Sequence, residues 1–219
     1  MDRQTIARPS SDLSAFTLTE SLHVTLETWA RRRLGKTDHE RRVAQIAGAL
    51  FDLTHDLHNL SRRNRSLLLA AALVHDVGRS EDADDHATTG AQMIFEDPRL
   101  PLAPSQRRAL AYLTQHHRGQ VPGLREDDIL SDDDNHDELL TILGLLRASD
   151  TLDSRSIDSP RLLLVRRQRH LQIRCLLRQP DERARKAFSR AKKYRLLEQT
   201  LNCTVELDIQ DGDAEILLG

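Results

Sequence analysis

The sequence contains a set of histidine and aspartate side chains whose types suit divalent transition metals. Imidazole nitrogens bind Mn, Fe, Co, Zn and Ni, and a carboxylate can bridge two ions. Seven such residues fall at the ends of predicted helices or on their apolar faces, where they would point inward: His39, His75, Asp76, His86, His116, His117 and Asp150. This set is large enough to hold two adjacent metal ions.

A simpler interpretation exists for single members of this set. A lone histidine on an apolar face is usually a hydrogen-bonded core residue, and Asp150 could cap the element that follows it. The position of Asp76 favours a bound cation. Asp76 lies at the end of the apolar helix that the stretch LLLAAALVHDVGRS (residues 67–80) predicts. The helix dipole disfavours a negative charge there by about 0.3–1 kcal/mol. The remaining histidines are interpreted as structural or solvent-facing: His23, His55, His58, His136 and His170.

Helices must position these ligands. TLTE (Thr17 to Glu20) has the capping-box form and predicts a first helix at 17–34. Apolar residues at helical spacing predict five more helices, the third of which would be capped by Gly78; they span residues 38–53, 64–77, 87–96, 105–117 and 136–150. We therefore expect an all-α bundle over residues 17–160, preceded by a disordered segment at 1–16.

The pattern changes after Pro160. RLLLVRR (161–167) and HLQIRCLL (170–177) are typical of strands, and residues 181–201 of a basic amphipathic helix. CTVELDI (203–209) and AEILL (214–218) predict two further strands around the turn DGD. The expected fold class is therefore mainly α, a helical bundle with a small α+β (strand-helix-strand) appendage. Residues 161–219 are too few to bury much core alone, so the appendage should pack on the bundle.

The net charge of −2 hides an uneven distribution. Residues 161–195 hold 13 Lys and Arg against 2 Asp and Glu, a balance of +11, whereas residues 1–160 carry −7 and residues 196–219 carry −6. This basic block is a candidate binding surface for a polyanion such as polyphosphate. Alternatively, it is a solvated face whose charges pair with the acidic body. Aromatic residues make up only 3% of the chain, which argues against stacking on single-stranded nucleic acid.

The composition also indicates the cellular compartment of the protein. Two cysteines, Cys175 and Cys203, fit a reducing compartment better than a disulfide framework. The N-terminal residues lack the apolar core of a signal peptide, and no apolar run approaches the roughly 20 residues of a membrane span. We expect a cytoplasmic protein with no membrane partner; a homodimer is left open.

Five segments in order resemble the HD-domain metal-dependent phosphohydrolase superfamily, whose signature is a histidine, a His-Asp pair and a distant aspartate: DHERRVAQIA, LVHDVGRS, HATTGAQMI, LTQHHRG and LLRASDTLD. The closest likeness is to the C-terminal HD region of the exopolyphosphatase/guanosine pentaphosphate phosphohydrolase family, and it extends to about residue 210. The chain lacks that family's actin-like domain, so polyphosphate hydrolysis is not expected of it as a stand-alone protein. The histidine pair also resembles that of HD-GYP phosphodiesterases. However, Arg118 replaces their glutamate and no Gly-Tyr-Pro follows, so specificity for cyclic di-GMP is not expected.

The resemblance implies roles for the candidate residues. One ion would be held by His39, His75, Asp76 and Asp150, and Asp76 would bridge to a second ion held by His86, His116 and His117. The implied activity is hydrolysis of a phosphate ester or anhydride of a nucleotide or related small phosphorylated substrate. Arg79 and Arg118 are placed to neutralise phosphate oxygens, or else to pair with acidic runs such as SEDADD. A competing hypothesis is a non-catalytic metal-containing sensor or a module that binds polyphosphate or (p)ppGpp; the complete ligand set favours the enzyme.

Overall fold

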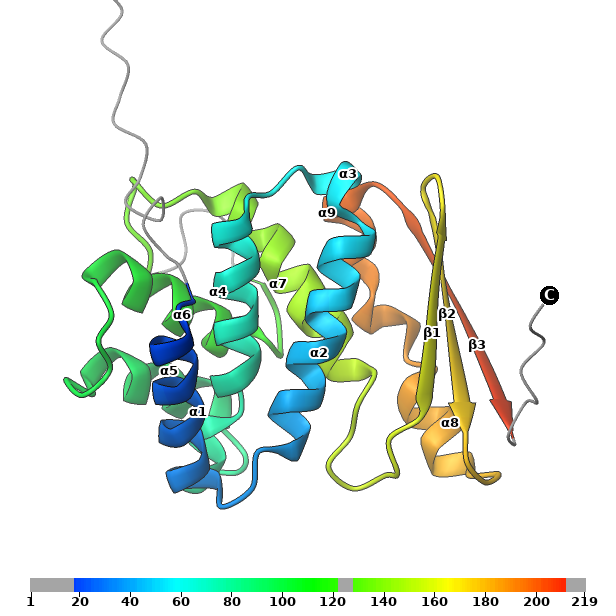
Figure 1. Cartoon of the computed structure of the whole chain (residues 1–219), viewed down its shortest axis with the longest axis horizontal. Coiled ribbons are helices and arrows are strands. Elements are labelled where there is room, and N and C mark those ends of the chain that lie inside the picture. The colour runs from blue at the N-terminus through cyan, green and yellow to red at the C-terminus, as the bar shows by residue number, and fades with distance from the viewer. Residues whose placement is uncertain (1–17, 122–127, 212–219) are drawn as a thin grey trace, which may run out of the picture.

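The computed structural model describes residues 18–121 and 128–211, and it consists of a helical body with a small sheet at one side (Figure 1). The body contains these elements in chain order: α1 (Glu20–Leu34), α2 (Asp38–Leu53), α3 (His55–His58), α4 (Arg62–Val74), the 3₁₀ turn η2 (Val77–Ser80), α5 (His86–Glu96), α6 (Pro104–His116) and α7 (His136–Thr151). The rest forms the appendage: β1 (Arg161–Arg167), β2 (His170–Leu177), α8 (Glu182–Phe188), η3 (Ala191–Lys193), α9 (Arg195–Leu201) and β3 (Thr204–Asp211). The predicted fold class is confirmed.

The core is centred on α4, which contacts α1, α2, α6 and α7. Its residues Leu67, Leu68 and Ala70–Val74 are almost completely buried, as expected for a helix that is apolar nearly all round. The same core continues into the appendage, because Leu197 of α9 and Ile173 of β2 belong to one buried cluster with Leu146 of α7. Body and appendage therefore share a single core.

The sheet has the strand order β1-β2-β3. β1 pairs antiparallel to β2, with Arg167 opposite His170, and β3 pairs parallel to β2, with His170 opposite Thr204. The parallel pair requires a crossover, which α8, η3 and α9 provide. Alternate residues of β2 are buried, namely Leu171, Ile173 and Cys175. The sheet thus packs one face on the helices.

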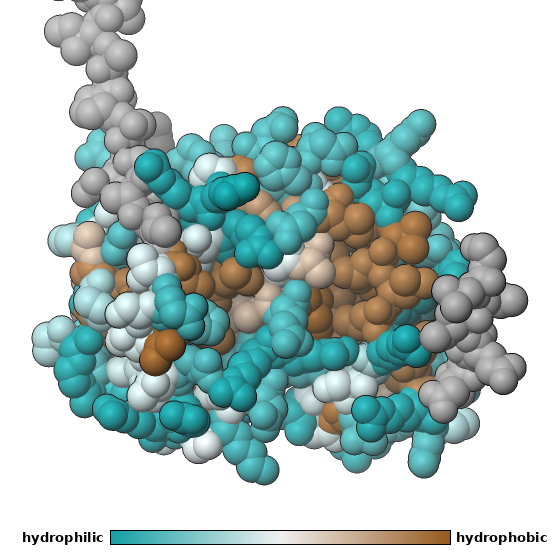
Figure 2. Space-filling model, viewed as in Figure 1, coloured by the Kyte–Doolittle hydropathy of each residue, from teal (hydrophilic) through white to brown (hydrophobic). Residues whose placement is uncertain are grey.

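The surface is mostly polar on the face that Figure 2 shows, with an apolar area around α2 and β1. Leu163 on β1 is an exposed large hydrophobic residue, at 47% of its full accessibility. Among the described helices, none combines the length and apolar character needed to cross a membrane.

Two predicted helix boundaries are wrong. The first helix begins at Glu20 instead of residue 17, because Thr19 is the N-cap and its side chain accepts a hydrogen bond from Leu22 N; Thr17 lies outside the described residues. The third helix ends at Val74, before the His-Asp pair, and the chain then turns into η2. Gly78 lies within η2 and is not the helix cap that the sequence predicts.

The predicted helix at 181–201 is broken into α8, η3 and α9. Phe188 of α8 packs with Leu177 of the sheet, whereas Leu197 of α9 packs with the helical core. One straight helix could not reach both surfaces, so the chain bends between them. The short helix α3 was not predicted. The segment predicted as a strand at 214–218 and the one predicted as disordered at 1–16 lie outside the described residues.

Glycine at position 144 of α7 is required by the approach of α9. A Cβ atom there would lie 3.1 Å from both the Cα and the N of Leu197, which are backbone atoms that cannot rotate away. We predict that Gly144→Ala lowers the free energy of unfolding by about 1–3 kcal/mol through overpacking. The matched control is Gly48→Ala in α2, whose Cβ would meet the flexible end of Arg65 at 3.1 Å. It should be neutral or stabilising by up to about 1 kcal/mol. Thermal melts of both variants check this; equal stability would contradict the packing.

Candidate metal centre

Two groups of metal-ligating side chains lie together and share Asp76. One group is His39, His75 and Asp76, and the other is Asp76, His86 and His117; in each, one ligand atom per residue lies within 4.8 Å of the others. All five side chains are buried. They come from the start of α2, the ends of α4 and α6, and the start of α5. These groups could hold metal ions.

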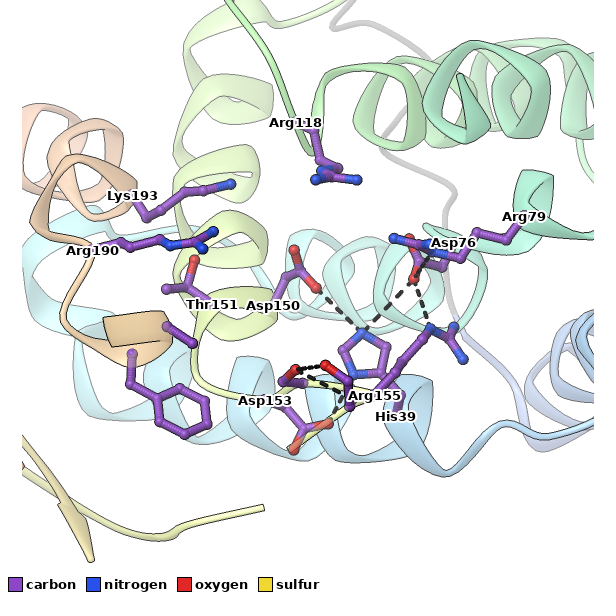
Figure 3. A pocket seen from close by; sticks show the side chains of 14 residues that line it. His39, Asp76, Arg79, Arg118, Asp150, Thr151, Asp153, Arg155, Arg190 and Lys193 are labelled. Atoms are coloured by element: carbon purple, nitrogen blue, oxygen red, sulfur yellow. Dashed lines mark hydrogen bonds and ion pairs between the residues drawn. The ribbon is translucent and has the colours of Figure 1, made fainter. Parts of the chain in front are cut away.

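Asp76 lies at the centre of this arrangement. Its Oδ1 is 3.1 Å from Nε2 of His86 and 3.5 Å from Nε2 of His117, and its Oδ2 is 4.0 Å from Nε2 of His39. Asp150, from the last turn of α7, adds a second carboxylate. Its Oδ1 is 3.3 Å from Nε2 of His39 (Figure 3). The same oxygen is 3.4 Å from Nε2 of His75.

Two predicted ligands belong to neither group: Asp150, which nevertheless lies beside His39 and His75, and His116. The ring of His116 lies beside the ring of Tyr112, with 4.7 Å between the centroids, and its backbone oxygen accepts a hydrogen bond from Arg147 Nε at 2.7 Å. Successive residues of a helix point about 100° apart, because a turn takes 3.6 residues. Only one of two adjacent histidines can face Asp76, and that one is His117.

Three of the rings share one orienting contact. Nδ1 of His75 lies 2.9 Å from the backbone oxygen of Ala72. Nδ1 of His86 lies 2.9 Å from the backbone oxygen of Ala83, and Nδ1 of His117 lies 2.6 Å from that of Thr114. In each case the carbonyl belongs to the residue three positions earlier. A carbonyl oxygen only accepts, so Nδ1 carries the proton and the Nε2 lone pair faces Asp76.

His39 is oriented by a carboxylate instead. Its Nδ1 lies 2.8 Å from Asp153 Oδ2, and Ser159 donates to the other oxygen of Asp153 at 2.6 Å. Metal-binding histidines in proteins are held in this way, with the second ring nitrogen bonded to a carbonyl or carboxylate. All four rings therefore present Nε2 to the same centre.

Two of these nitrogens lack partners within the described part of the chain. Nε2 of His75 and Nε2 of His117 are buried and make no hydrogen bond there. A buried polar atom without a partner costs about 1–3 kcal/mol. A metal ion would satisfy both atoms, so the residues present fit the metal dependence that their types suggest.

The electrostatics of the centre also favour a cation. Burial alone would raise the pKa of Asp76, but the neighbouring imidazoles of His75, His117 and His86 lower it well below its usual range. Burial opposes a proton on His75, yet Asp76 and Asp150 outweigh it and raise the pKa of His75 to about 9. Burial would likewise raise the pKa of Asp150, but His39 and His75 lower it, so both carboxylates are ionised and favour a cation beside them.

A close backbone approach brings His86 to Asp76. A Cβ on Gly78 would lie 2.2 Å from the oxygen of His86 and 2.5 Å from the N of Gly90. Only glycine at position 78 lets η2 lie directly against the start of α5. The glycine that the sequence suggests as a helix cap therefore sets the distance between two candidate ligands.

Arginines surround the outer side of Asp76. Arg79 Nε donates to Asp76 Oδ2 at 2.7 Å, and Arg155 Nε donates to the same oxygen at 2.9 Å. Arg155 also pairs with Glu40, whose side chain is fully buried. Arg118 Nη1 lies 3.2 Å from Nε2 of His86. Of the two arginines suggested for phosphate contact, Arg79 is thus paired with the carboxylate of a candidate ligand, whereas the Arg118 side chain lies against His86 and has no carboxylate partner among the described residues.

Sequence reasoning missed Arg155, Glu40 and Asp153. Two of them carried a signal: Glu40 follows His39 in the first turn of α2, and Asp153 comes three residues after Asp150. Arg155 carried none, because it lies in an irregular segment after α7.

A cavity of about 350 Å³ opens beside the centre. Its walls include His39, Asp76 and Asp150, and they come from both the body and the appendage (Figure 3). Five cationic side chains line it: Arg79, Arg118, Arg155, Arg190 and Lys193. A small anionic molecule could reach the candidate ligands from this cavity.

The family model described as the HD domain matches residues 37–155, more than half of the chain. The matched region begins at Thr37, just before α2, and ends at Arg155. It contains every candidate ligand and leaves out α1 and the appendage.

Asp153 provides a test of the metal centre that leaves the ligands in place. We predict that Asp153→Asn weakens metal binding about 10- to 100-fold, because His39 loses the carboxylate that orients its ring. Titration calorimetry with Mn²⁺ or Zn²⁺ measures the affinity. Asp158→Asn is the matched control, since Asp158 is exposed in the same segment. Equal affinities of the two variants would mean that His39 is not a ligand.

Proposed function

This chain belongs to the HD-domain family, and from that premise we propose that it is a metal-dependent phosphohydrolase. The substrate would be a phosphate ester or anhydride of a nucleotide or a related small phosphorylated metabolite. The observation that carries the proposal is the convergence of four histidine Nε2 atoms and two carboxylates beside a cavity lined by arginines. The histidines and carboxylates suit metal ions and the arginines suit phosphate oxygens.

The proposed ligands fall into two sets that share Asp76. His39, His75, Asp76 and Asp150 would hold one divalent ion, and Asp76, His86 and His117 a second; His116 is left out. Two bound ions of Mn, Fe, Co, Zn or Ni would supply a hydrolytic nucleophile at neutral pH and neutralise charge on the phosphoryl group.

The surrounding residues position these ligands and the substrate. Asp153 keeps the proton of His39 on Nδ1, so that Nε2 stays available. Arg79 and Arg155 hold the carboxylate of Asp76 in place through Oδ2. Arg118 lines the cavity and has no carboxylate partner among the described residues, which leaves its guanidinium free for phosphate oxygens. The closer likeness to the exopolyphosphatase/guanosine pentaphosphate phosphohydrolase family stays a prediction.

Phosphate release from purified protein tests the proposal directly. The protein is loaded in turn with Mn, Fe, Co, Zn and Ni, its metal content is measured, and it is assayed against phosphomonoesters, diesters and anhydrides. Asp76→Asn should lose metal from both positions and lose activity, because Asp76 belongs to both ligand sets. Asp132→Asn, at an exposed position, serves as the control. Wild-type protein that binds no metal would contradict the proposal, and metal-loaded protein without hydrolysis would favour the sensor hypothesis.

Arg79 and Arg118 should respond differently to replacement by alanine. Arg118→Ala should leave the metal content unchanged and lower kcat/KM about 10- to 150-fold, since a charge-assisted contact contributes about 1.5–3 kcal/mol. Arg118→Lys should recover only part of this loss, because lysine lacks the planar two-pronged donor. Arg79→Ala should also weaken metal binding, because it frees the Oδ2 side of Asp76. An Arg118→Ala variant with full activity would exclude the phosphate contact.

A further inference from the structure

Two cations of the appendage line the cavity together with Arg118. They are Arg190, which follows α8, and Lys193, at the end of η3. Figure 3 shows all three side chains directed toward the space beside Asp150, Arg118 from the body and the other two from the appendage. None of the three forms an ion pair with a carboxylate of the described residues, in contrast to Arg79 and Arg155, which pair with Asp76.

The positive charge continues away from the candidate metal centre. A second cavity, of about 660 Å³, shares Arg118 and Lys193 with the first and adds Arg147, Lys192 and Arg195. The described residues that line it include no Asp or Glu. Burial lowers the pKa of Lys193. The positive charges of Arg118, Arg147 and Arg190 lower this pKa further, whereas the negative charge of Asp150 raises it. These cations therefore lie close enough to repel one another.

Three cations of the basic block are neutralised by carboxylates. Arg166 pairs with Asp56 at 2.6 Å, Arg174 with Asp208 at 3.7 Å, and Arg185 with Asp211. The block thus agrees in part with the solvated-face interpretation. Arg118, Arg190 and Lys193 have no such partner among the described residues and face one cavity, where a bound anion would offset the repulsion between them.

We propose that Arg118, Arg190 and Lys193 form a second anion subsite, which binds a phosphate group of the substrate other than the one that is cleaved. The inference rests on the proposed function, because it takes the scissile phosphate to lie at the metal ligands. Its consequence is the substrate class: a compound with at least two phosphate groups, and not a simple phosphomonoester. Arg190 and Lys193 lie outside the region that matches the HD domain, so the appendage would supply this specificity.

Binding to metal-free protein tests the subsite without any need for hydrolysis. The full chain, stripped of metal and checked for folding by its thermal melt, is titrated with inorganic tripolyphosphate and with orthophosphate. Wild-type protein should bind tripolyphosphate more tightly. In the double variant Arg190→Ala/Lys193→Ala the Kd for tripolyphosphate should rise at least about 100-fold, since each of the two lost charge-assisted contacts contributes at least about tenfold.

The matched control is Arg178→Ala/Arg183→Ala, which removes the same charge from exposed positions of the appendage that line neither cavity. It should change the Kd less than threefold. Equal losses in the two double variants would reduce the effect to net charge and overturn the subsite. Equal wild-type affinities for the two anions would overturn the substrate class. Because no metal is present, these results are independent of the hydrolysis assay, and a failure of either proposal can be told from a failure of the other.

Discussion

The buried carboxylate of Asp76 is the constraint on which the surrounding structure depends. Only 3% of the residue is exposed, and an ionised carboxylate at such a place costs several kcal/mol unless positive or hydrogen-bonding groups surround it. The ends of three helices and the irregular segment after α7 supply such groups to it. Each is a separate long-range contact, so the helices must pack in one arrangement for all of them to form. The arrangement that satisfies Asp76 is also the one that gathers the candidate ligands.

Backbone carbonyls fix which face each histidine presents. In His75, His86 and His117 the acceptor is the carbonyl three residues earlier, so a contact within one turn of chain selects the tautomer. The rings can then offer only an acceptor to the centre. Acceptors facing carboxylates repel one another unless a cation or a proton lies between them. The raised pKa of His75 means that a proton can lie between this ring and the carboxylates. A metal ion would compete with that proton, so metal binding should release it.

Sequence patterns predicted most of the helices, both strands of the hairpin and the residues that approach Asp76, because helical periodicity and ligand chemistry are local properties. They did not decide between His116 and His117, since the choice depends on the angle at which α6 meets α4. They also missed Arg155, whose position is set by the path of the chain after α7. The break between α8 and α9 was not predicted for a similar reason. Amphipathic spacing shows that one face of the segment is buried, but it does not show that the two halves of the segment pack on different surfaces.

The contact between α7 and α9 couples the two walls of the cavity. α7 carries Asp150 at its last turn and is held against Leu197 at Gly144, and Lys193 lies two residues before the start of α9. The position of the appendage cations relative to the metal ligands is therefore fixed by core packing and not by a flexible linker. Core packing thus holds the backbone of Arg190 and Lys193 beside the cavity that Asp76 and Asp150 also line. The same packing that makes the appendage part of the fold also makes it part of the cavity.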